Sequence, residues 1–332
     1  MNNLLNFNFL TPVPPGTKRP RWSVMIPTYN CADYAVETIT SVLKQDPGED
    51  LMQIEVIDDG SHDNIAEVVQ RVGKGRVAFF QQPANVGHIR NFETALSRSR
   101  GEYVHLLHGD DRVLWGFYAE MGSLLEQHPG AGAAFCRHYF MDATGDQHYI
   151  SPLVANTSGV LANFLEHEAR QNIIQTPAMV VRRKVYEVTG MFDKRLQHSE
   201  DWEMWVRIGA AYPVIYCKTP LAEYRNYDQS HTVFTTAQES AIEIEQLAQS
   251  IIREHAGSRV NSLKKSHMEY FVSNGWYNLL KLYKTGQRSA AIRILKQYLG
   301  FPLPAKGKLR LLKQMAVLEW QFQQHKKARK RK

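Results

Sequence analysis

Short apolar runs alternate with amphipathic stretches along the first third of the chain. The runs that end in Pro, Gly, Asn or Asp are typical of strands, and they cover residues 22–26, 54–57, 77–80 and 103–107. Between them, apolar residues recur every three or four positions from about Asp33, from about Asp63 and over 91–98, which predicts three helices. Alternation of strand and helix is typical of a mostly parallel sheet with helices on its faces. The pattern therefore predicts an α/β fold.

Polar residues follow three of these predicted strands. The first strand runs into Thr28-Tyr29-Asn30, the second into Asp58-Asp59-Gly60-Ser61 and the fourth into Gly109-Asp110-Asp111. The carboxyl ends of parallel strands meet at one edge of the sheet, where α/β proteins bind ligands. Adjacent carboxylates there suit a hard divalent cation that also contacts the phosphate oxygens of a substrate. An acidic turn is the alternative for so short a motif.

The second half of the chain has a different pattern. A strand is predicted at 214–217, and helices are predicted from Ala237 to Ile251, near 261–284, over 287–299 and over 307–328. The run Pro12-Val13-Pro14-Pro15-Gly16 is typical of a linker. We therefore expect a flexible segment over 1–20, a catalytic-type α/β domain over 21–235 and a helical region over 236–332.

Charge is concentrated at the carboxyl end. The net charge is +7, but residues 305–332 hold ten Lys or Arg against a single acid, Glu319, and the rest of the chain is close to neutral. The body therefore lacks the basic patch of a nucleic-acid-binding protein. The basic, partly amphipathic end indicates either peripheral contact with an anionic membrane or a solvated tail.

The remaining composition bears on location and excludes two protein classes. Three distant cysteines, the lack of a secretory signal and the lack of an apolar run long enough to span a bilayer predict a cytoplasmic protein, with the inner face of the membrane as a peripheral site. No G-x-G-x-x-G follows the first strand and no G-x-x-x-x-G-K-S/T is present, so dinucleotide-binding dehydrogenases and P-loop enzymes are not indicated.

Five motifs in order resemble those of a family 2 glycosyltransferase over roughly residues 22 to 232. They are Val24 to Asn30, Asp58-Asp59-Gly60-Ser61, Asn85-Val86-Gly87 with Arg90-Asn91, Gly101-Glu102-Tyr103 leading into Asp110-Asp111, and Gly190-Met191-Phe192-Asp193 followed by Ser199-Glu200-Asp201-Trp202. The resemblance implies a GT-A type fold, a nucleotide-sugar donor and transfer with inversion. It also implies an acceptor hydroxyl on a glycan, a lipid-linked glycan or a surface polysaccharide.

The resemblance assigns donor-binding roles to several residues. Pro27 and Thr28 shape the first loop, Tyr29 stacks on the nucleotide base, and Asp59 accepts a hydrogen bond from a base that is most often uracil. Arg90 lies near the donor phosphates in relatives, with an exposed helix arginine as the alternative.

By motif position, Asp111 coordinates the divalent metal, Mn²⁺ or Mg²⁺, and Asp110 contacts the ribose or the sugar. Many relatives carry Asp where this chain has His108, so this histidine is either a ligand or structural. Arg225 and His231 fall in a segment that closes over the diphosphate in relatives.

Asp201 is the expected catalytic base, because inversion needs one carboxylate beside the acceptor hydroxyl. Glu200 is its neighbour in the motif, and acids favoured at a helix start are the alternative explanation. A glycosyltransferase-like binding protein without turnover stays open because of His108. A nucleotidyltransferase is a further alternative, but its Gly-rich, Arg-containing loop is absent after the first strand. Acceptor choice is expected in loops over 140–175, which carry no motif.

Overall fold

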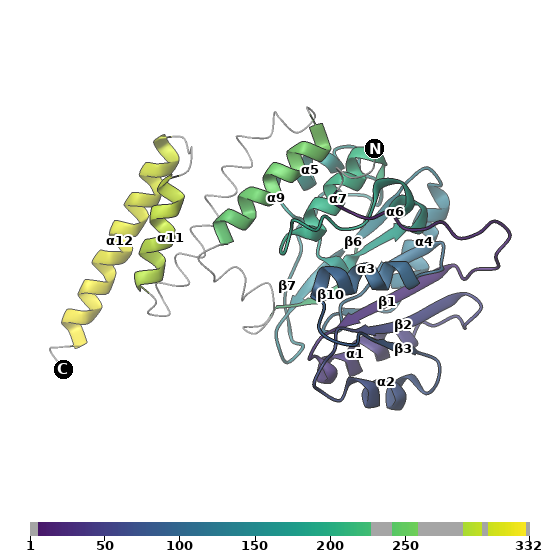
Figure 1. The fold of residues 1–332 in the computed structure, drawn as a ribbon. Helices are drawn as coiled ribbons and strands as arrows, with labels where there is room; N and C mark the ends of the chain where they lie inside the picture. The colour runs from purple at the N-terminus through teal and green to yellow at the C-terminus, as the bar shows by residue number, and fades with distance from the viewer. Residues whose placement is uncertain (1–5, 227–240, 258–287, 301–304, 330–332) are drawn as a thin grey trace.

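In the computed structural model, which describes residues 6–226, 241–257, 288–300 and 305–329, the centre of the molecule is a ten-stranded sheet flanked by helices (Figure 1). The strands are β1 Trp22–Thr28, β2 Met52–Asp58, β3 Ala78–Gln81, β4 Tyr103–Leu106, β5 Arg112–Val113, β6 Ala133–Met141, β7 Gln147–Ile150, β8 Gly159–Val160, β9 Met179–Arg182 and β10 Val214–Arg225. The helices are α1 Ala32–Leu43, α2 Ile65–Gly73, α3 His88–Arg98, α4 Phe117–Gln127, α5 Phe164–Arg170, the 3₁₀ helix η1 Thr176–Ala178, α6 Arg183–Thr189, α7 Glu200–Ala211, α9 Ala241–Ala256, α11 Arg288–Gly300 and α12 Ala305–Arg329.

The sheet has the order β3-β2-β1-β4-β9-β6-β10-β5. The first four strands in this order are parallel, β9 runs antiparallel between β4 and β6, and β10 is parallel to β6. The mostly parallel sheet predicted from the sequence is thus confirmed. The strand predicted at 214–217 continues to Arg225.

The order of the strands places the helices. The crossovers from β1 through α1 to β2 and through α2 to β3 advance in one direction along the sheet, whereas the crossover from β3 through α3 to β4 returns across it. Because such crossovers are right-handed, α1 and α2 cover one face and α3 the other, as Figure 1 shows. Every residue of β1 and β2 is buried, which explains their apolar runs.

The amino-terminal segment lies against this domain from residue 6 onward. Leu10 is buried, and its backbone N–H donates to the carbonyl oxygen of Tyr186 at 3.2 Å. The ring of Phe7 lies 4.3 Å from the guanidinium carbon of Arg207. The sequence expectation for residues 1–20 is a flexible segment; within it, Leu10 contacts α6 and Phe7 contacts α7.

The carboxyl-terminal helices follow their predicted positions. The helix α9 packs on α7, and its residues Ala248 and Ile251 form a small buried cluster with Leu196. The helices α11 and α12 pack against each other (Figure 1). The helix expected near 261–284 lies outside the described residues. Within the described part of the chain, no helix combines the length and the apolar character that a membrane span requires.

Candidate donor and catalytic site

A cavity of about 780 Å³ opens at the carboxyl ends of β1, β2 and β4. Its wall is built from the loops that follow these strands, the start of α3, the segment before η1, the start of α7 and the end of β10. The predicted site residues in its lining are Pro27, Thr28, Tyr29, Asp59, Asp110, Glu200, Asp201 and Arg225. The edge of the sheet predicted from the sequence is therefore where these side chains meet.

Two adjacent aspartates at the end of β2 have different environments. Asp58 is fully buried, and its carboxylate accepts hydrogen bonds from the Thr28 hydroxyl at 3.0 Å, the Ser61 backbone N–H at 2.8 Å and the Gln81 amide at 3.0 Å. Asp58 therefore holds the loops after β1, β2 and β3 together. Asp59 is left to face the cavity.

Asp59 ties the loop before α3 to this edge. Its carboxylate accepts the backbone N–H groups of Val86 at 2.8 Å and Gly87 at 3.1 Å, while burial raises the pKa of Asp59. Tyr29 is 47% exposed and lines the cavity, so its side chain is accessible to a ligand. An exposed aromatic face beside a carboxylate can hold a nucleotide base by stacking and hydrogen bonding.

Three side chains after β4 form a group that fits a divalent cation. The ligand atoms of His108, Asp110 and Asp111 all lie within 4.8 Å of one another. Gly109 allows this loop to pass close to β1, because a Cβ there would lie 2.5 Å from the Thr28 side chain. Among the described residues, neither the Nε2 atom of His108 nor the Oδ2 atom of Asp111 has a hydrogen-bond partner, although both are buried.

The electrostatics of this group agree with cation binding. Burial raises the pKa of Asp111 well above its usual range, and the neighbouring Asp110 adds to this effect. Burial lowers the pKa of His108, so its imidazole is neutral and able to act as a ligand. A cation would give Oδ2 of Asp111 a partner, and Nδ1 of His108 lies 3.9 Å from this oxygen. Asp111 itself lies behind the cavity wall, whereas Asp110 lines the cavity.

Arg225 is fully engaged in supporting this group. Its backbone N–H donates to Asp111 Oδ1 at 2.8 Å and its Nε to the Asp110 carbonyl oxygen at 2.8 Å. One terminal nitrogen donates to Glu37 at 2.7 Å and the other to the carbonyl oxygens of Asp142 and Ala143. The guanidinium that the resemblance assigns to the diphosphate therefore binds protein groups.

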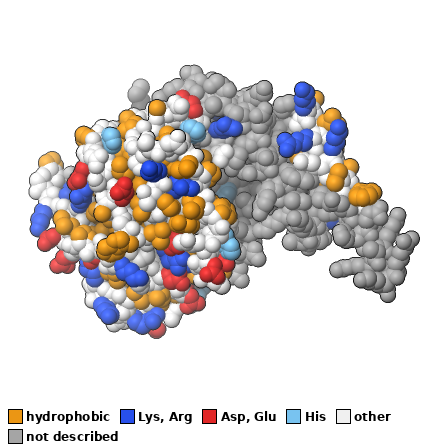
Figure 2. All heavy atoms as spheres, turned by 180° about the vertical axis from the view of Figure 1, so that it is seen from behind, with side chains coloured by type: hydrophobic (Ala, Val, Ile, Leu, Met, Phe, Trp, Pro, Cys, Tyr) orange, Lys and Arg blue, Asp and Glu red, His pale blue; other side chains and the backbone are white. Residues whose placement is uncertain are grey.

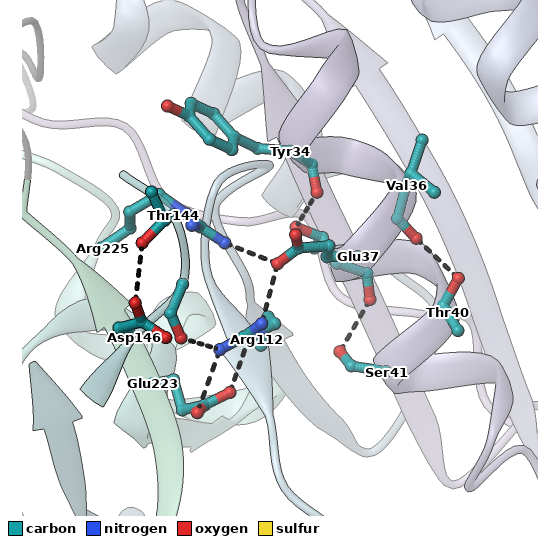
Figure 3. A network of polar contacts seen from close by, with 12 residues as sticks. Tyr34, Val36, Glu37, Thr40, Ser41, Arg112, Thr144, Asp146, Glu223 and Arg225 are labelled. Atoms are coloured by element: carbon teal, nitrogen blue, oxygen red, sulfur yellow. Dashed lines mark hydrogen bonds and ion pairs between the residues drawn. The ribbon is translucent and has the colours of Figure 1, made fainter. Parts of the chain in front are cut away.

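Glu37 connects Arg225 to a second arginine, the half-buried Arg112 (Figure 3). Arg112 donates to Glu37 at 2.8 Å, to Glu223 at 2.7 Å and to the Gly145 carbonyl oxygen at 2.9 Å. The two arginines and two glutamates alternate in charge and join α1, β5, β10 and the turn between β6 and β7. This network fixes the position of the loop that carries the cation-binding group.

At the opposite wall, two adjacent carboxylates begin α7. Asp201 accepts hydrogen bonds from the Thr176 hydroxyl at 3.2 Å and from the Trp202 backbone N–H at 2.7 Å. Burial and the neighbouring charge of Glu200 raise the pKa of Asp201 to about 7. Asp201 can therefore accept a proton near neutral pH.

The pKa of Glu200 is shifted in the opposite direction to that of Asp201. Its Oε1 atom lies 3.3 Å from Nε2 of His88. Although burial opposes ionisation, the hydrogen bond and charge of His88, together with the charge of His198, lower the pKa of Glu200 to about 2. Adjacent carboxylates whose pKa values diverge indicate different roles, and only Asp201 is tuned as a base.

Besides Asp111, which lies behind the wall, two predicted site residues are not among the described residues that line the cavity. Arg90 is exposed on α3 and is not in the lining, and His231 lies outside the described residues. Three residues of the site have no motif that identifies them: His88, Thr176 and His198. A histidine at the first position of α3 is the only signal that could have drawn attention to His88.

Known proteins share sequence similarity with this chain. The sequence profile of the family described as Glycosyl transferase family 2 matches residues 23–190. An uncharacterized glycosyltransferase of Mycoplasma genitalium is 33% identical over 94 residues, which cover 27% of this chain and 32% of the relative. Chondroitin synthase of Pasteurella multocida is 25% identical over 198 residues, which cover 57% of this chain and 19% of the synthase. The chain thus spans from about a third to about two thirds of the first curated relatives it matches.

Solved structures share the fold. S. aureus TarS in complex with UDP-GlcNAc superimposes with a TM-score of 0.64 at 17% identity, over 92% of either chain. A mannosyltransferase from Pyrobaculum calidifontis in complex with GDP-Man and Mn²⁺ superimposes with a TM-score of 0.53 at 18% identity, over 92% of this chain and 82% of the mannosyltransferase. At this identity the likeness establishes the fold.

Proposed function

The chain belongs to glycosyl transferase family 2, and we propose that it is a metal-assisted, inverting glycosyltransferase. It moves a sugar from a nucleoside-diphosphate donor, a UDP-sugar, to a hydroxyl of a glycan, lipid-linked glycan or surface polysaccharide. The observation that carries this proposal is Asp201, a carboxylate with a pKa of about 7 in the cavity that Tyr29, Asp59 and Asp110 also line.

The nucleotide binds at the end of β1 and β2. Tyr29 stacks on the base, and Asp59 accepts a hydrogen bond from it with oxygen lone pairs that its two backbone contacts leave open. Pro27 and Thr28 form the floor of this subsite. The two structural neighbours bind UDP-GlcNAc and GDP-Man, which supports a sugar nucleotide without deciding between the bases.

His108, Asp110 and Asp111 would hold the divalent cation. Bound there, it would supply Lewis-acid neutralisation of the charge on the departing diphosphate. The mixed set of one imidazole and two carboxylates favours Mn²⁺ over Mg²⁺, because Mg²⁺ prefers oxygen ligands alone. Arg225 and Arg112 position these ligands from behind through Glu37.

Asp201 performs the proton transfer of a single displacement. It takes the proton of the acceptor hydroxyl as that oxygen attacks the anomeric carbon and the bond to the diphosphate breaks. Thr176 orients the carboxylate, and Glu200 stays ionised beside His88 and raises the proton affinity of Asp201. Inversion follows because no covalent sugar–enzyme intermediate forms.

The test combines nucleotide binding with donor turnover. Calorimetric titration of UDP with Mn²⁺, with Mg²⁺ and with a chelator is expected to show metal-dependent binding in the wild type and in Asp201→Asn. Release of UDP from UDP-sugars in the presence of glycan acceptors is expected only in the wild type. Binding without turnover in the wild type would favour the binding-protein alternative raised by His108. A folded protein that binds no nucleoside diphosphate would refute the proposal.

The carboxyl-terminal helix provides peripheral contact with anionic membranes. The residues Leu309, Leu312, Val317 and Trp320 of α12 are exposed although they are apolar, and Lys and Arg residues are interleaved with them. Figure 2 shows basic and apolar side chains together on the described part of these helices, and charges of both signs on the body. Sedimentation with vesicles containing phosphatidylserine, but not with neutral vesicles, is the expected result.

A further inference from the structure

A second cavity, of about 390 Å³, lies between β6, β7, β10 and the segment from α5 to η1. Asn172 and Gln175 line both this cavity and the donor cavity. The next residue after Gln175 is Thr176, whose hydroxyl contacts Asp201. The two cavities therefore share a wall beside the proposed base, and the mechanism above uses nothing in the second one.

A buried histidine in this cavity has no hydrogen-bond partner for either ring nitrogen in the part of the chain that the structure describes, although its ring packs on Phe140 with centroids 4.8 Å apart. His138 is 1% exposed, and its backbone N–H donates to the Ser151 hydroxyl at 3.0 Å. Neither ring nitrogen has a hydrogen-bond partner among the described residues, and His138 is in the cavity lining. Burial lowers the pKa of His138 to about 4, so the ring is neutral and offers one donor and one acceptor. Two hydroxyl groups of a ligand, one accepting and one donating, can satisfy both nitrogens.

Aromatic rings form one wall. The rings of Phe140 and Tyr149 are stacked with centroids 4.3 Å apart, and Tyr149 is 56% exposed. Tyr216 lines the same cavity. An aromatic face next to hydrogen-bonding groups suits a ligand that is apolar on one side and hydroxylated on its rim.

The charged residues of the lining are all basic. Arg137 and Arg170 belong to it, whereas no Asp or Glu does. Within the described part of the chain, neither arginine forms an ion pair. Arg137 donates through Nε to the Ser151 carbonyl oxygen at 2.9 Å, which leaves its two terminal nitrogens for a ligand. Guanidinium groups without a carboxylate partner are suited to carboxylate or phosphate oxygens.

We propose that the second cavity binds the acceptor, and that the acceptor unit is a sugar that carries an anionic group. His138 binds a sugar hydroxyl, Tyr149 contacts the ring face, and Arg137 and Arg170 bind the carboxylate or phosphate. The role of this sugar as the acceptor rests on the proposed transferase function. The binding of an anionic sugar does not.

The test is ligand-observed NMR titration of the full chain with matched probes. 4-Nitrophenyl β-D-glucuronide and glucose 6-phosphate carry the two kinds of anion, and 4-nitrophenyl β-D-glucoside is the neutral counterpart of the first. At least one charged probe is expected to bind about tenfold more tightly than the glucoside, and saturating UDP with Mn²⁺ should not displace it. The tighter of the two charged probes identifies the anion.

Arg170→Gln is expected to remove the preference for the charged probe. Because Arg170 is exposed, the substitution should not disturb the fold. Arg71→Gln, at an exposed site on α2 beyond the other end of the sheet, is the matched control and should behave as wild type. His138→Phe should weaken charged and neutral probes alike. Equal binding of charged and neutral sugars, displacement by UDP, or an unchanged preference in Arg170→Gln would overturn the inference.

Titration of UDP on the same samples separates this inference from the proposed function. A protein that binds UDP with Mn²⁺ but does not prefer a charged sugar overturns the acceptor site and leaves the donor site intact. A protein that binds the charged sugar in the second cavity but binds no nucleotide supports the cavity and overturns the transferase.

Discussion

Removing the Thr176 hydroxyl tests whether Asp201 is the base. Thr176→Val keeps the shape of this buried side chain but deletes the hydrogen bond that favours the ionised Asp201. A hydrogen bond to a charged group contributes ~1.5–3 kcal/mol, and the 3.2 Å length places this one at the weak end. Loss of ~1.4 kcal/mol corresponds to about one pKa unit. We therefore expect the pKa of Asp201 to rise from about 7 by that amount.

The sign of the effect on rate follows from the role of the carboxylate. A base must be ionised, so activity is lost as the pH falls through its pKa. At pH 7 the ionised fraction drops from about one half to about one tenth, a roughly fivefold loss of rate. At about pH 9 both proteins are mostly ionised, and their rates should agree.

The assay is UDP release at saturating donor and Mn²⁺, followed across the acid limb of the pH profile. Thr176→Ser is the matched control, because it keeps the hydroxyl and should leave the limb in place. A uniform loss of rate at every pH would mean that Thr176 acts by packing alone. An acid limb that stays at its wild-type position in Thr176→Val would refute the assignment of Asp201.

Three further substitutions probe the donor site and its support. Asp111→Asn removes one carboxylate ligand, and calorimetry should show Mn²⁺-dependent UDP binding weakened by more than about tenfold; unchanged binding would contradict the ligand assignment. Tyr29→Ala removes a stacking contact of ~1–3 kcal/mol and should weaken UDP about tenfold, whereas Tyr29→Phe should not. Arg225→Met leaves buried carbonyl oxygens unpaired, and urea unfolding should show a stability loss of ~2–3 kcal/mol; a change within experimental error would argue against the network.

The fold was predictable where both faces of a strand are buried. β1 and β2 are buried at every position and most of their residues are apolar, so their composition identifies them without knowledge of their partners. β9 was not predicted, because it has four residues and pairs with β4 and β6, which are distant in sequence. The prediction for β10 stopped at Cys217, since the register shifts there and Pro220 follows.

The site was predictable as far as its residues sit in motifs. Tyr29, Asp59, Asp110 and Asp201 come from different loops and line one cavity. What tunes them was not predictable, because Thr176 reaches Asp201 from a separate loop and no spacing encodes that contact. The motif position of an arginine also does not reveal which groups its guanidinium binds in the folded chain.

Arg225 and His138 illustrate the same limit from opposite directions. Arg225 has a motif position that implies phosphate binding, but its guanidinium donates hydrogen bonds to Glu37 and to three carbonyl oxygens instead. His138 has no motif position, yet its ring nitrogens have no hydrogen-bond partner among the described residues and the residue lines a cavity. Whether a polar side chain is available to a ligand is decided by the contacts of the folded chain.

The partner of the proposed base is fixed to the rigid centre of the sheet. Pro177 follows Thr176 in η1, and its carbonyl oxygen lies 3.0 Å from Nε2 of His105, a fully buried residue of β4. Burial lowers the pKa of His105 to about 3, so this ring stays neutral and the contact does not titrate across the working pH range. The same short helix continues directly into β9. The orientation of Asp201 is therefore set by the core. Gln175, one residue before Thr176, lines both cavities. A ligand in the second cavity would therefore lie beside Asp201 without displacing its side chain.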